Sequence, residues 1–129
     1  MKKYSDENYP LQEESYQIIG ICMEVHKILG KGLLEIVYKD AIEYEFKKNN
    51  IPYKREKKFV VEYKETILSH HFFADFVVYD KIILEVKAQK GLIEEHYSWV
   101  MNYCKISKCK LGLLINFGEK SLVTKRIIV

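Results

Sequence analysis

Two carboxylates and one ammonium group lie inside one of the most apolar stretches of the chain. The stretch reads "FFADFVVYDKIILEVKA" over residues 72–88, and it contains Asp75, Glu85 and Lys87. Carboxylate oxygens suit Mg²⁺, which typically takes one or two of them together with waters and substrate phosphates. A metal lowers the pKa of its bound water, and a partly buried lysine can orient or deprotonate that water. These residue types therefore fit metal-dependent hydrolysis of a phosphodiester.

The register of the predicted hairpin decides whether the three charges meet. Successive side chains of a strand point to opposite faces, so Glu85 and Lys87 share one face. A three-residue loop over 79–81 brings Asp75 directly opposite Glu85, whereas a two-residue turn shifts the register by one and separates them. The alternative to a catalytic site is a structural salt bridge between Glu85 and Lys87 on a half-covered face of the sheet.

The surrounding elements follow from the spacing of apolar residues, which is helical in some segments and strand-like in others. Strand signals begin at Tyr53, after two helices. In chain order we expect a helix within 11–32 that Gly30 and Gly32 end, and a helix over 33–50. Strands over 57–63, 66–68, 70–79 and 81–88 follow, then a helix over 92–107 and strands over 110–117 and 122–129. This order predicts an α/β fold with a central sheet. With no repeat or linker, we expect a single domain over 1–129 whose first ten residues form a polar arm.

Composition narrows the function classes. The chain has 129 residues and a net charge of +3, which permits a nucleic-acid partner without requiring one. No apolar run approaches 18 residues, and residues 1–10 lack the apolar core of a signal peptide, so we expect neither a membrane span nor secretion. Three cysteines without a C-x-x-C pair favour a reducing, cytoplasmic compartment. The densest basic stretch, residues 53–59, is either a solvated edge strand or a strip that contacts phosphates.

The order D-x9-E-x-K across a hairpin resembles the PD-(D/E)XK nuclease superfamily, whose fold is restriction-endonuclease-like. The residue before Asp75 is Ala74, where that pattern often has proline. The stretch "GKGLLEIVYKDAIEYEF" adds Gly32, Glu35 and Tyr38 at the spacing that names the GxxExxY family of this superfamily. "GLLINF" and "EEHYSWVMNYCK" are also similar to that family, so the resemblance covers about residues 15–129.

The resemblance implies a three-layer core in which a central mixed sheet is flanked by helices. It implies that Mg²⁺ or Mn²⁺ is bound by Asp75, Glu85 and Glu35, with the backbone carbonyl of Val86 as a further ligand. Lys87 would position the attacking water. The alternative for Glu35 is an exposed carboxylate that the N-terminus of its helix stabilises.

Three aromatic or imidazole side chains are candidates for substrate positioning: Tyr38, Tyr103 and His96. Tyr38 fits equally well as a core aromatic with a satisfied hydroxyl, and His96 as an ordinary half-buried helix residue. Nucleases of this kind often carry Q-x-x-x-Y on the helix after the active strand, and here the glutamine position is Trp99, whose indole only donates hydrogen bonds. The departure affects the positioning of substrate or water and leaves the metal ligands intact.

The adjacent histidines His70 and His71 point to opposite faces of a regular strand, so they cannot bind one metal together. We interpret them as structural or substrate-facing. The function expected from the sequence is a metal-dependent nuclease that acts on DNA or RNA, with a homodimer as one way to cut duplexes. The alternative is a catalytically inactive module that binds nucleic acid or another protein on the same scaffold.

Overall fold

The computed structural model describes residues 11–129, and the predicted polar arm over residues 1–10 lies outside the described residues. The elements run in the order α1 (Gln12–Leu29), α2 (Glu35–Lys48), β1 (Tyr53–Tyr63), β2 (Thr66–Val78), β3 (Ile82–Lys87), α3 (Glu94–Ser107), β4 (Leu111–Asn116) and β5 (Val123–Ile128). No helix within residues 11–129 has the length and apolar character needed to span a membrane.

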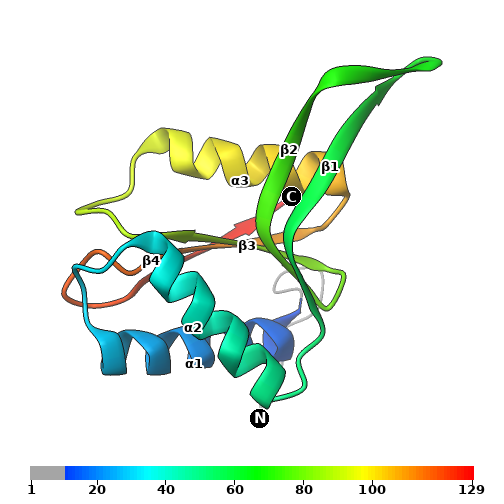
Figure 1. The fold of residues 1–129 in the computed structure, drawn as a ribbon. Coiled ribbons are helices and arrows are strands. Elements are labelled where there is room, and N and C mark those ends of the chain that lie inside the picture. The colour runs from blue at the N-terminus through cyan, green and yellow to red at the C-terminus, as the bar shows by residue number, and fades with distance from the viewer. Residues whose placement is uncertain (1–10) are drawn as a thin grey trace, which may run out of the picture.

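The sheet has five strands in the order β1-β2-β3-β4-β5. All neighbours are antiparallel except β3 and β4, which are parallel. A parallel pair needs a crossover connection, and α3 supplies it. The predicted mixed α/β architecture is confirmed (Figure 1).

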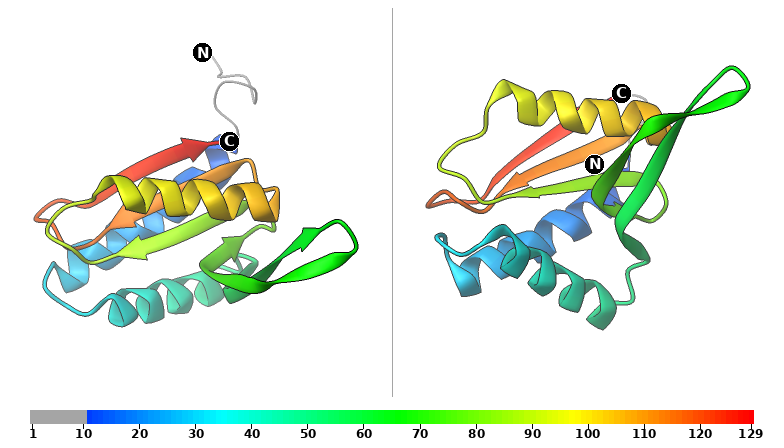
Figure 2. Two further views of the ribbon diagram at one scale, coloured as in Figure 1. Left: turned by 90° about the horizontal axis from the view of Figure 1, so that it is seen from above. Right: turned by 45° about the horizontal axis from the view of Figure 1, so that its top comes forward.

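Helices cover both faces of the sheet. In Figure 1 α3 lies above the sheet and α1 and α2 lie below it, and the two further views in Figure 2 show the same three layers. The larger core fills the space between the sheet and α1–α2, around Tyr38, Phe46 and Phe117. A smaller core fills the space under α3, around Ile83, Val100 and Leu114. The three-layer core implied by the resemblance is therefore present.

Gly112 allows α3 to pack closely on β4. A Cβ atom at this position would lie 2.4 Å from Cγ1 of Val100 and 3.0 Å from Sγ of Cys104, both on α3. Contacts this short force the neighbours to move, and overpacking of a core costs about 1–3 kcal/mol. The glycine thus fixes the distance between the helix and the sheet on the side where Lys87 and Trp99 meet.

The loop between β2 and β3 has three residues. Val78 pairs with Ile82, as the three-residue loop over 79–81 requires, and the alternative two-residue turn is wrong. Tyr79 and Asp80 both have positive φ values, 57° and 55°, which lets the chain reverse without a glycine. Asp75 and Glu85 are therefore brought to the same level of the sheet.

One predicted boundary is wrong. The segment 66–68 is part of β2, which runs unbroken from Thr66 to Val78 because β1 pairs with it over most of its length. The first helix ends at Leu29, as the glycines Gly30 and Gly32 predict, since Gly30 has φ 70° and leaves the helical conformation. The basic stretch over 53–59 does lie on an edge strand of the sheet that residues 11–129 form, in which β1 pairs with β2 alone.

Candidate active site

The backbone ladder between β2 and β3 ends where the two sheet carboxylates begin. Backbone pairing runs from Val78 back to Phe76. At the next position the N–H of Asp75 donates to Oε1 of Glu85 at 2.8 Å, and the N–H of Val86 donates to Oδ2 of Asp75 at 2.9 Å. Each carboxylate thus replaces a backbone acceptor where the strands separate. Each side chain is therefore held by a backbone N–H group of the opposite strand.

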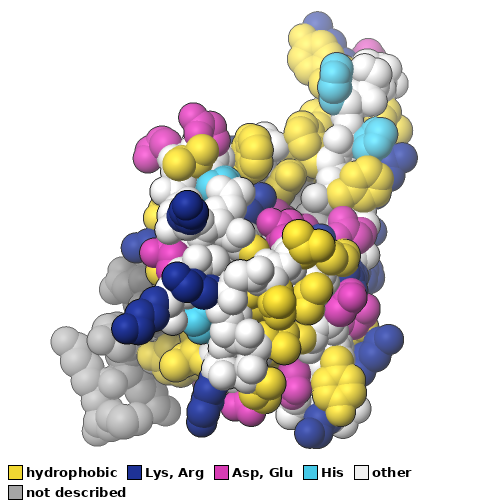
Figure 3. All heavy atoms as spheres, turned by 60° about the vertical axis from the view of Figure 1, so that its left-hand side comes forward, with side chains coloured by type: hydrophobic (Ala, Val, Ile, Leu, Met, Phe, Trp, Pro, Cys, Tyr) yellow, Lys and Arg dark blue, Asp and Glu magenta, His cyan; other side chains and the backbone are white. Residues whose placement is uncertain are grey.

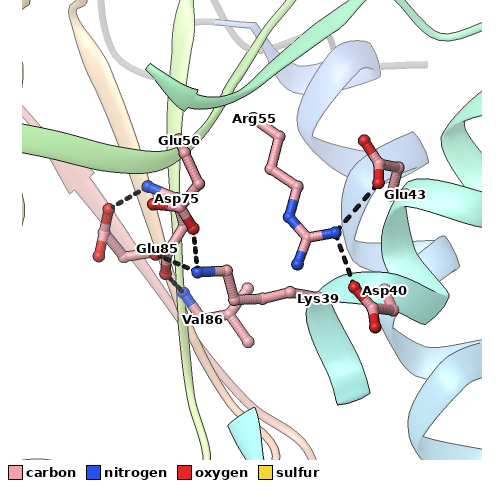
Figure 4. Close-up of polar contacts among 8 residues, drawn as sticks. All are labelled: Lys39, Asp40, Glu43, Arg55, Glu56, Asp75, Glu85 and Val86. Carbon is pink, nitrogen blue, oxygen red and sulfur yellow. Dashed lines mark hydrogen bonds and ion pairs between the residues drawn. The ribbon is translucent and has the colours of Figure 1, made fainter. Parts of the chain in front are cut away.

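A lysine from α2 reaches this pair. Lys39 Nζ donates to Oδ1 of Asp75 at 2.9 Å and also to the carboxylate of Glu56 on β1 (Figure 4). The Lys39 and Asp75 side chains are almost completely buried, whereas the Glu56 side chain is half exposed. The ammonium group of Lys39 therefore pairs with two carboxylates, the buried one of Asp75 and the half-exposed one of Glu56.

The chain of β1 is distorted at Glu56. The register that joins Arg55 to Phe76 and Lys57 to Ala74 places Glu56 opposite Asp75, but Glu56 has φ 53°, a conformation that non-glycine residues adopt rarely. Next to it, Arg55 donates to Asp40 at 2.8 Å and to Glu43 at 3.0 Å, which ties β1 to α2. These contacts hold the edge strand over α2 and orient Glu56 toward Lys39.

The electrostatics of the site follow from burial and from the closeness of like charges. Burial, and then the neighbouring Asp75 carboxylate, raise the pKa of Glu85 to about 9, so Glu85 holds a proton at neutral pH when no cation is bound. Burial opposes the charged form of Lys39, but its hydrogen bonds to Glu56 and Asp75 outweigh burial and raise its pKa. The site therefore carries a charged lysine and a carboxyl group that keeps its proton at neutral pH.

Lys87 lies on the same face as Glu85 and turns toward α3. Its Nζ is 5.3 Å from the centre of the Trp99 ring, a cation–π distance. Within residues 11–129 it has no carboxylate at ion-pair distance, in contrast to Lys39. The simple salt bridge between Glu85 and Lys87 is therefore absent from this part of the chain. Trp99 does not accept hydrogen bonds, but its ring covers the ammonium group.

Glu35 begins α2 and is half-buried beside the site. Burial raises its pKa, Lys87 lowers it, and Asp75 raises it further. The charges of Asp75 on β2 and Lys87 on β3 are thus close enough to influence Glu35. Its position near the helix N-terminus does not leave it in open solvent.

The predicted positioning residues on α3 lie near the same charges. Burial, followed by Glu85, Asp75 and Glu56, raises the pKa of Tyr103. His96 is buried, and its Nδ1 accepts a hydrogen bond from the N–H of Ile93 at 3.0 Å. Burial and then Lys87 lower its pKa, so the neutral ring carries its proton on Nε2.

Two predicted residues have contacts that are plainly structural. The Tyr38 hydroxyl donates to the carbonyl of Gly30 at 2.6 Å and accepts from the N–H of Leu33 at 3.2 Å, and its ring stacks on Phe117. The hydroxyl is therefore committed to the α1–α2 connection and does not join the carboxylates. Val86 takes part through its N–H, which holds Asp75, and its side chain belongs to the larger core.

Sequence reasoning missed Lys39 and Glu56. Lys39 follows Glu35 by four residues, so the two share a helix face, and that spacing could have pointed to it. Glu56 is the acidic residue within the basic stretch "YKREKKF". Its place opposite Asp75 depends on the register between β1 and β2, which the sequence alone left open.

The donor set suits a hard divalent cation held by few protein ligands. Within the described residues no three acidic, histidine or cysteine side chains already surround a common point. Asp75 and Glu85 supply the one or two carboxylates that Mg²⁺ typically takes while it keeps its waters. Lys39 already places a positive charge on Asp75. The residues therefore fit a two-carboxylate metal site, with Glu35 and Glu56 as the further acids beside it.

Comparisons with known proteins bear on the fold and on the superfamily. No curated protein matches the chain. The crystal structure of SSO0001 is similar to the fold, with a TM-score of 0.59 and 17% sequence identity. The similarity covers 95% of this chain and 58% of that one, so this chain spans less than two thirds of SSO0001. Residues 12–127 match the family model of the PD-(D/E)XK nuclease superfamily, and the chain belongs to that superfamily.

Proposed function

We propose that this chain is a metal-dependent nuclease that hydrolyses phosphodiester bonds of DNA or RNA. The observation that carries the proposal is the mutual fixation of Asp75 and Glu85, each bonded to the backbone of the opposite strand, beside Lys39 and Lys87. Hydrogen bonds within a ladder need no carboxylates. Burying two acids at the point where the strands separate costs free energy. Acids in such unfavourable surroundings are common at functional sites.

The residues divide into three tasks. Asp75 and Glu85 would hold Mg²⁺ or Mn²⁺, with Glu35 and the Val86 carbonyl as further ligands. Lys87 would orient the attacking water, while the Trp99 ring limits the directions in which its ammonium group can point. Tyr103 and His96 would line the substrate side of the sheet, where His96 can donate from Nε2.

A bound divalent cation supplies an activated water and stabilises charge that develops on the phosphate. Asp75 has its present positive partner in Lys39, so a cation bound by Asp75 competes with that ammonium group. Glu85 gives up its proton when it binds a cation, which makes metal affinity depend on pH. Lys39 would then remain paired with Glu56 at the edge of the site.

A second candidate is a nucleic-acid-binding module on the same scaffold that does not turn over. It is favoured by one observation, the position of Lys87 over Trp99, because a lysine held by an indole ring is less available to a water. The GxxExxY assignment, the metal and the cytoplasmic location belong to the proposal as well. The buried thiols of Cys22, Cys104 and Cys109 are in keeping with a reducing compartment.

The test is a cleavage screen with fluorescent oligonucleotides that include single-stranded, duplex and branched DNA and RNA. With Mg²⁺ or Mn²⁺ the wild type should cut at least one of them, and Glu85→Gln should not. Lys87→Ala should lose cleavage but keep metal binding, since Lys87 is not a ligand in this proposal. Binding of oligonucleotides without any cleavage, under every metal condition, would contradict the nuclease and leave the second candidate.

A further inference from the structure

The β1–β2 hairpin extends well beyond the rest of the sheet. Pairing of β2 with β3 stops at Phe76. Within residues 11–129 no third strand lies beside residues 57–73, which are here called the arm. Figures 1 and 2 show the arm projecting past α3. Its base is held by Phe72, which packs edge-on against Tyr103 on α3. An isolated two-stranded hairpin is marginally stable in water, so a projecting one is expected to have a partner.

The arm exposes side chains that a solvated hairpin does not need. Figure 3 shows hydrophobic and histidine side chains gathered along it, with lysines at its edges. The large apolar side chains exposed here are Val60, Tyr63, Ile67, Leu68 and Phe73. Such a surface marks an interaction site when it is rimmed by polar residues.

One face of the arm is continuous with the candidate active site. Side chains two apart on a strand share a face, so Lys58 and Val60 follow Glu56, and Phe73 and His71 follow Asp75. The register places these residues side by side, because Lys58 pairs with Phe73 and Val60 pairs with His71. A ligand with a phosphate bound at Asp75 and Glu85 would therefore extend along this face of the arm.

The chemistry of this face fits a polynucleotide strand. Phe73 is 48% exposed, and the His71 ring lies edge-on to it with the ring centres 5.3 Å apart. Exposed aromatic faces stack on bases, and lysines beside them contact the phosphates. The arm carries three lysines, Lys57, Lys58 and Lys64, against Glu62 and Glu65. This excess of positive charge complements a polyanion better than it complements a second copy of the same arm.

We infer that the Lys58–Phe73–His71 face of the arm binds an unpaired strand of nucleic acid on one side of the cleavage point. Phe73 stacks on a base, and Lys58 pairs with a phosphate. The inference rests on the proposed function, because it places the scissile phosphate at Asp75 and Glu85. It names single-stranded segments as the substrate class.

The experiment measures binding without cleavage. Fluorescence anisotropy in EDTA would follow labelled single-stranded DNA, RNA of the same sequence and the matching duplex. The variants are Phe73→Ala and Lys58→Ala, and the control is Tyr44→Ala, which removes an aromatic that is 63% exposed on α2, away from the arm. Light scattering of the same proteins reports the oligomeric state, and thermal unfolding shows that each variant is folded.

We expect Phe73→Ala to weaken binding of a single strand by about fivefold to a hundredfold, as loss of one stacked base implies. Lys58→Ala should weaken it less and reduce its salt dependence. The Tyr44→Ala protein should bind like the wild type. Tighter binding of DNA or of RNA would identify which strand the arm prefers.

Equal binding by Phe73→Ala, Lys58→Ala and wild type would overturn the inference. A wild-type dimer that Phe73→Ala converts to a monomer, with oligonucleotide binding unchanged, would also overturn it and make the arm a contact between copies. The proposed function fails separately. If the arm variants lose binding although the wild type never cleaves, the inference about the arm is supported and the proposed nuclease activity is wrong. If cleavage depends on Glu85 but the arm variants bind like the wild type, the nuclease activity is supported and the inference about the arm is wrong.

Discussion

The two halves of β2 have opposite surroundings although they belong to one strand and share β1 as a partner. From Ala74 to Val78 every residue is buried, whereas from Thr66 to Phe73 all but Phe72 are exposed. The difference comes from β3 and the helices, which cover only the half from Ala74 to Val78. Asp75 therefore lies in the half of β2 that is buried, whereas the aromatic and basic side chains of the arm are exposed and accessible to a ligand.

The largest expected effect is on chemistry in the buried half. Asp75→Asn should remove metal binding and lower cleavage by at least about a thousandfold, because the metal supplies several kcal/mol of transition-state stabilisation. Initial cleavage rates measure this. The matched control is Asp80→Asn, which changes an exposed acid in the β2–β3 loop. If the two variants cleaved at the same rate, Asp75 would not be a ligand.

Two phenylalanines three positions apart compare the halves directly. Phe76→Ala should lower the free energy of unfolding by about 3–5 kcal/mol, because Phe76 is fully buried and packs edge-on against Phe46. Phe73→Ala should lower it by less than about 1 kcal/mol, as exposed positions usually do. Urea unfolding gives both values. Similar costs would mean that the arm is part of the core and would weaken its assignment to ligand binding.

Removal of the buried ammonium group should destabilise the metal-free protein. Lys39→Met keeps the aliphatic stem but leaves Asp75 without its cation, and breaking a buried pair costs about 3 kcal/mol. Unfolding in EDTA measures this, with Lys31→Met as the exposed control. Added Mn²⁺ should stabilise Lys39→Met more than the wild type, since no ammonium group then competes for Asp75. Equal stabilisation would separate Lys39 from the metal site.

A further expected effect is a pH dependence set by Glu85. Its pKa is raised in the folded state from 4.5 to about 9, so the folded protein keeps a proton that the unfolded chain loses. Stability is therefore lost as the pH rises through this range. Glu85→Gln removes the loss, and in EDTA it should gain at least about 1 kcal/mol on the wild type between pH 5 and pH 9. Glu65→Gln changes an exposed acid and should show the same pH dependence of stability as the wild type. If the stability difference between Glu85→Gln and the wild type did not change with pH, Glu85 would not be a buried acid with a raised pKa.

Sequence patterns predicted the parts of the structure that depend on contacts between residues close together in the sequence. Alternation along 72–88 placed Asp75 and Glu85 in a hairpin, and the three-residue loop brought them together. The continuity of β2 was missed because the polar Ser69 separates the two predicted strands, 66–68 and 70–79, while pairing with β1 keeps this exposed segment extended.

Contacts between distant segments were harder to predict. Lys39 meets Asp75 across 36 positions, and this depends on how α2 lies against the sheet. The partner of Lys87 was also not foreseen. Trp99 was recognised as a departure from the expected glutamine, but its cation–π contact with Lys87 arises only when α3 packs back on β3. Packing distances of this kind, such as the one that Gly112 allows, are not encoded by periodicity.

Calorimetric titration of Mn²⁺ into the wild type, Glu85→Gln and Glu65→Gln tests the central claim most directly. The account predicts binding by the wild type and by Glu65→Gln, loss of binding in Glu85→Gln, and wild-type affinity that rises with pH as Glu85 releases its proton. Absence of binding by the wild type at millimolar Mn²⁺, with and without a mixture of oligonucleotides, would contradict it. The two carboxylates would then be a buried polar contact that closes the end of the β2–β3 ladder.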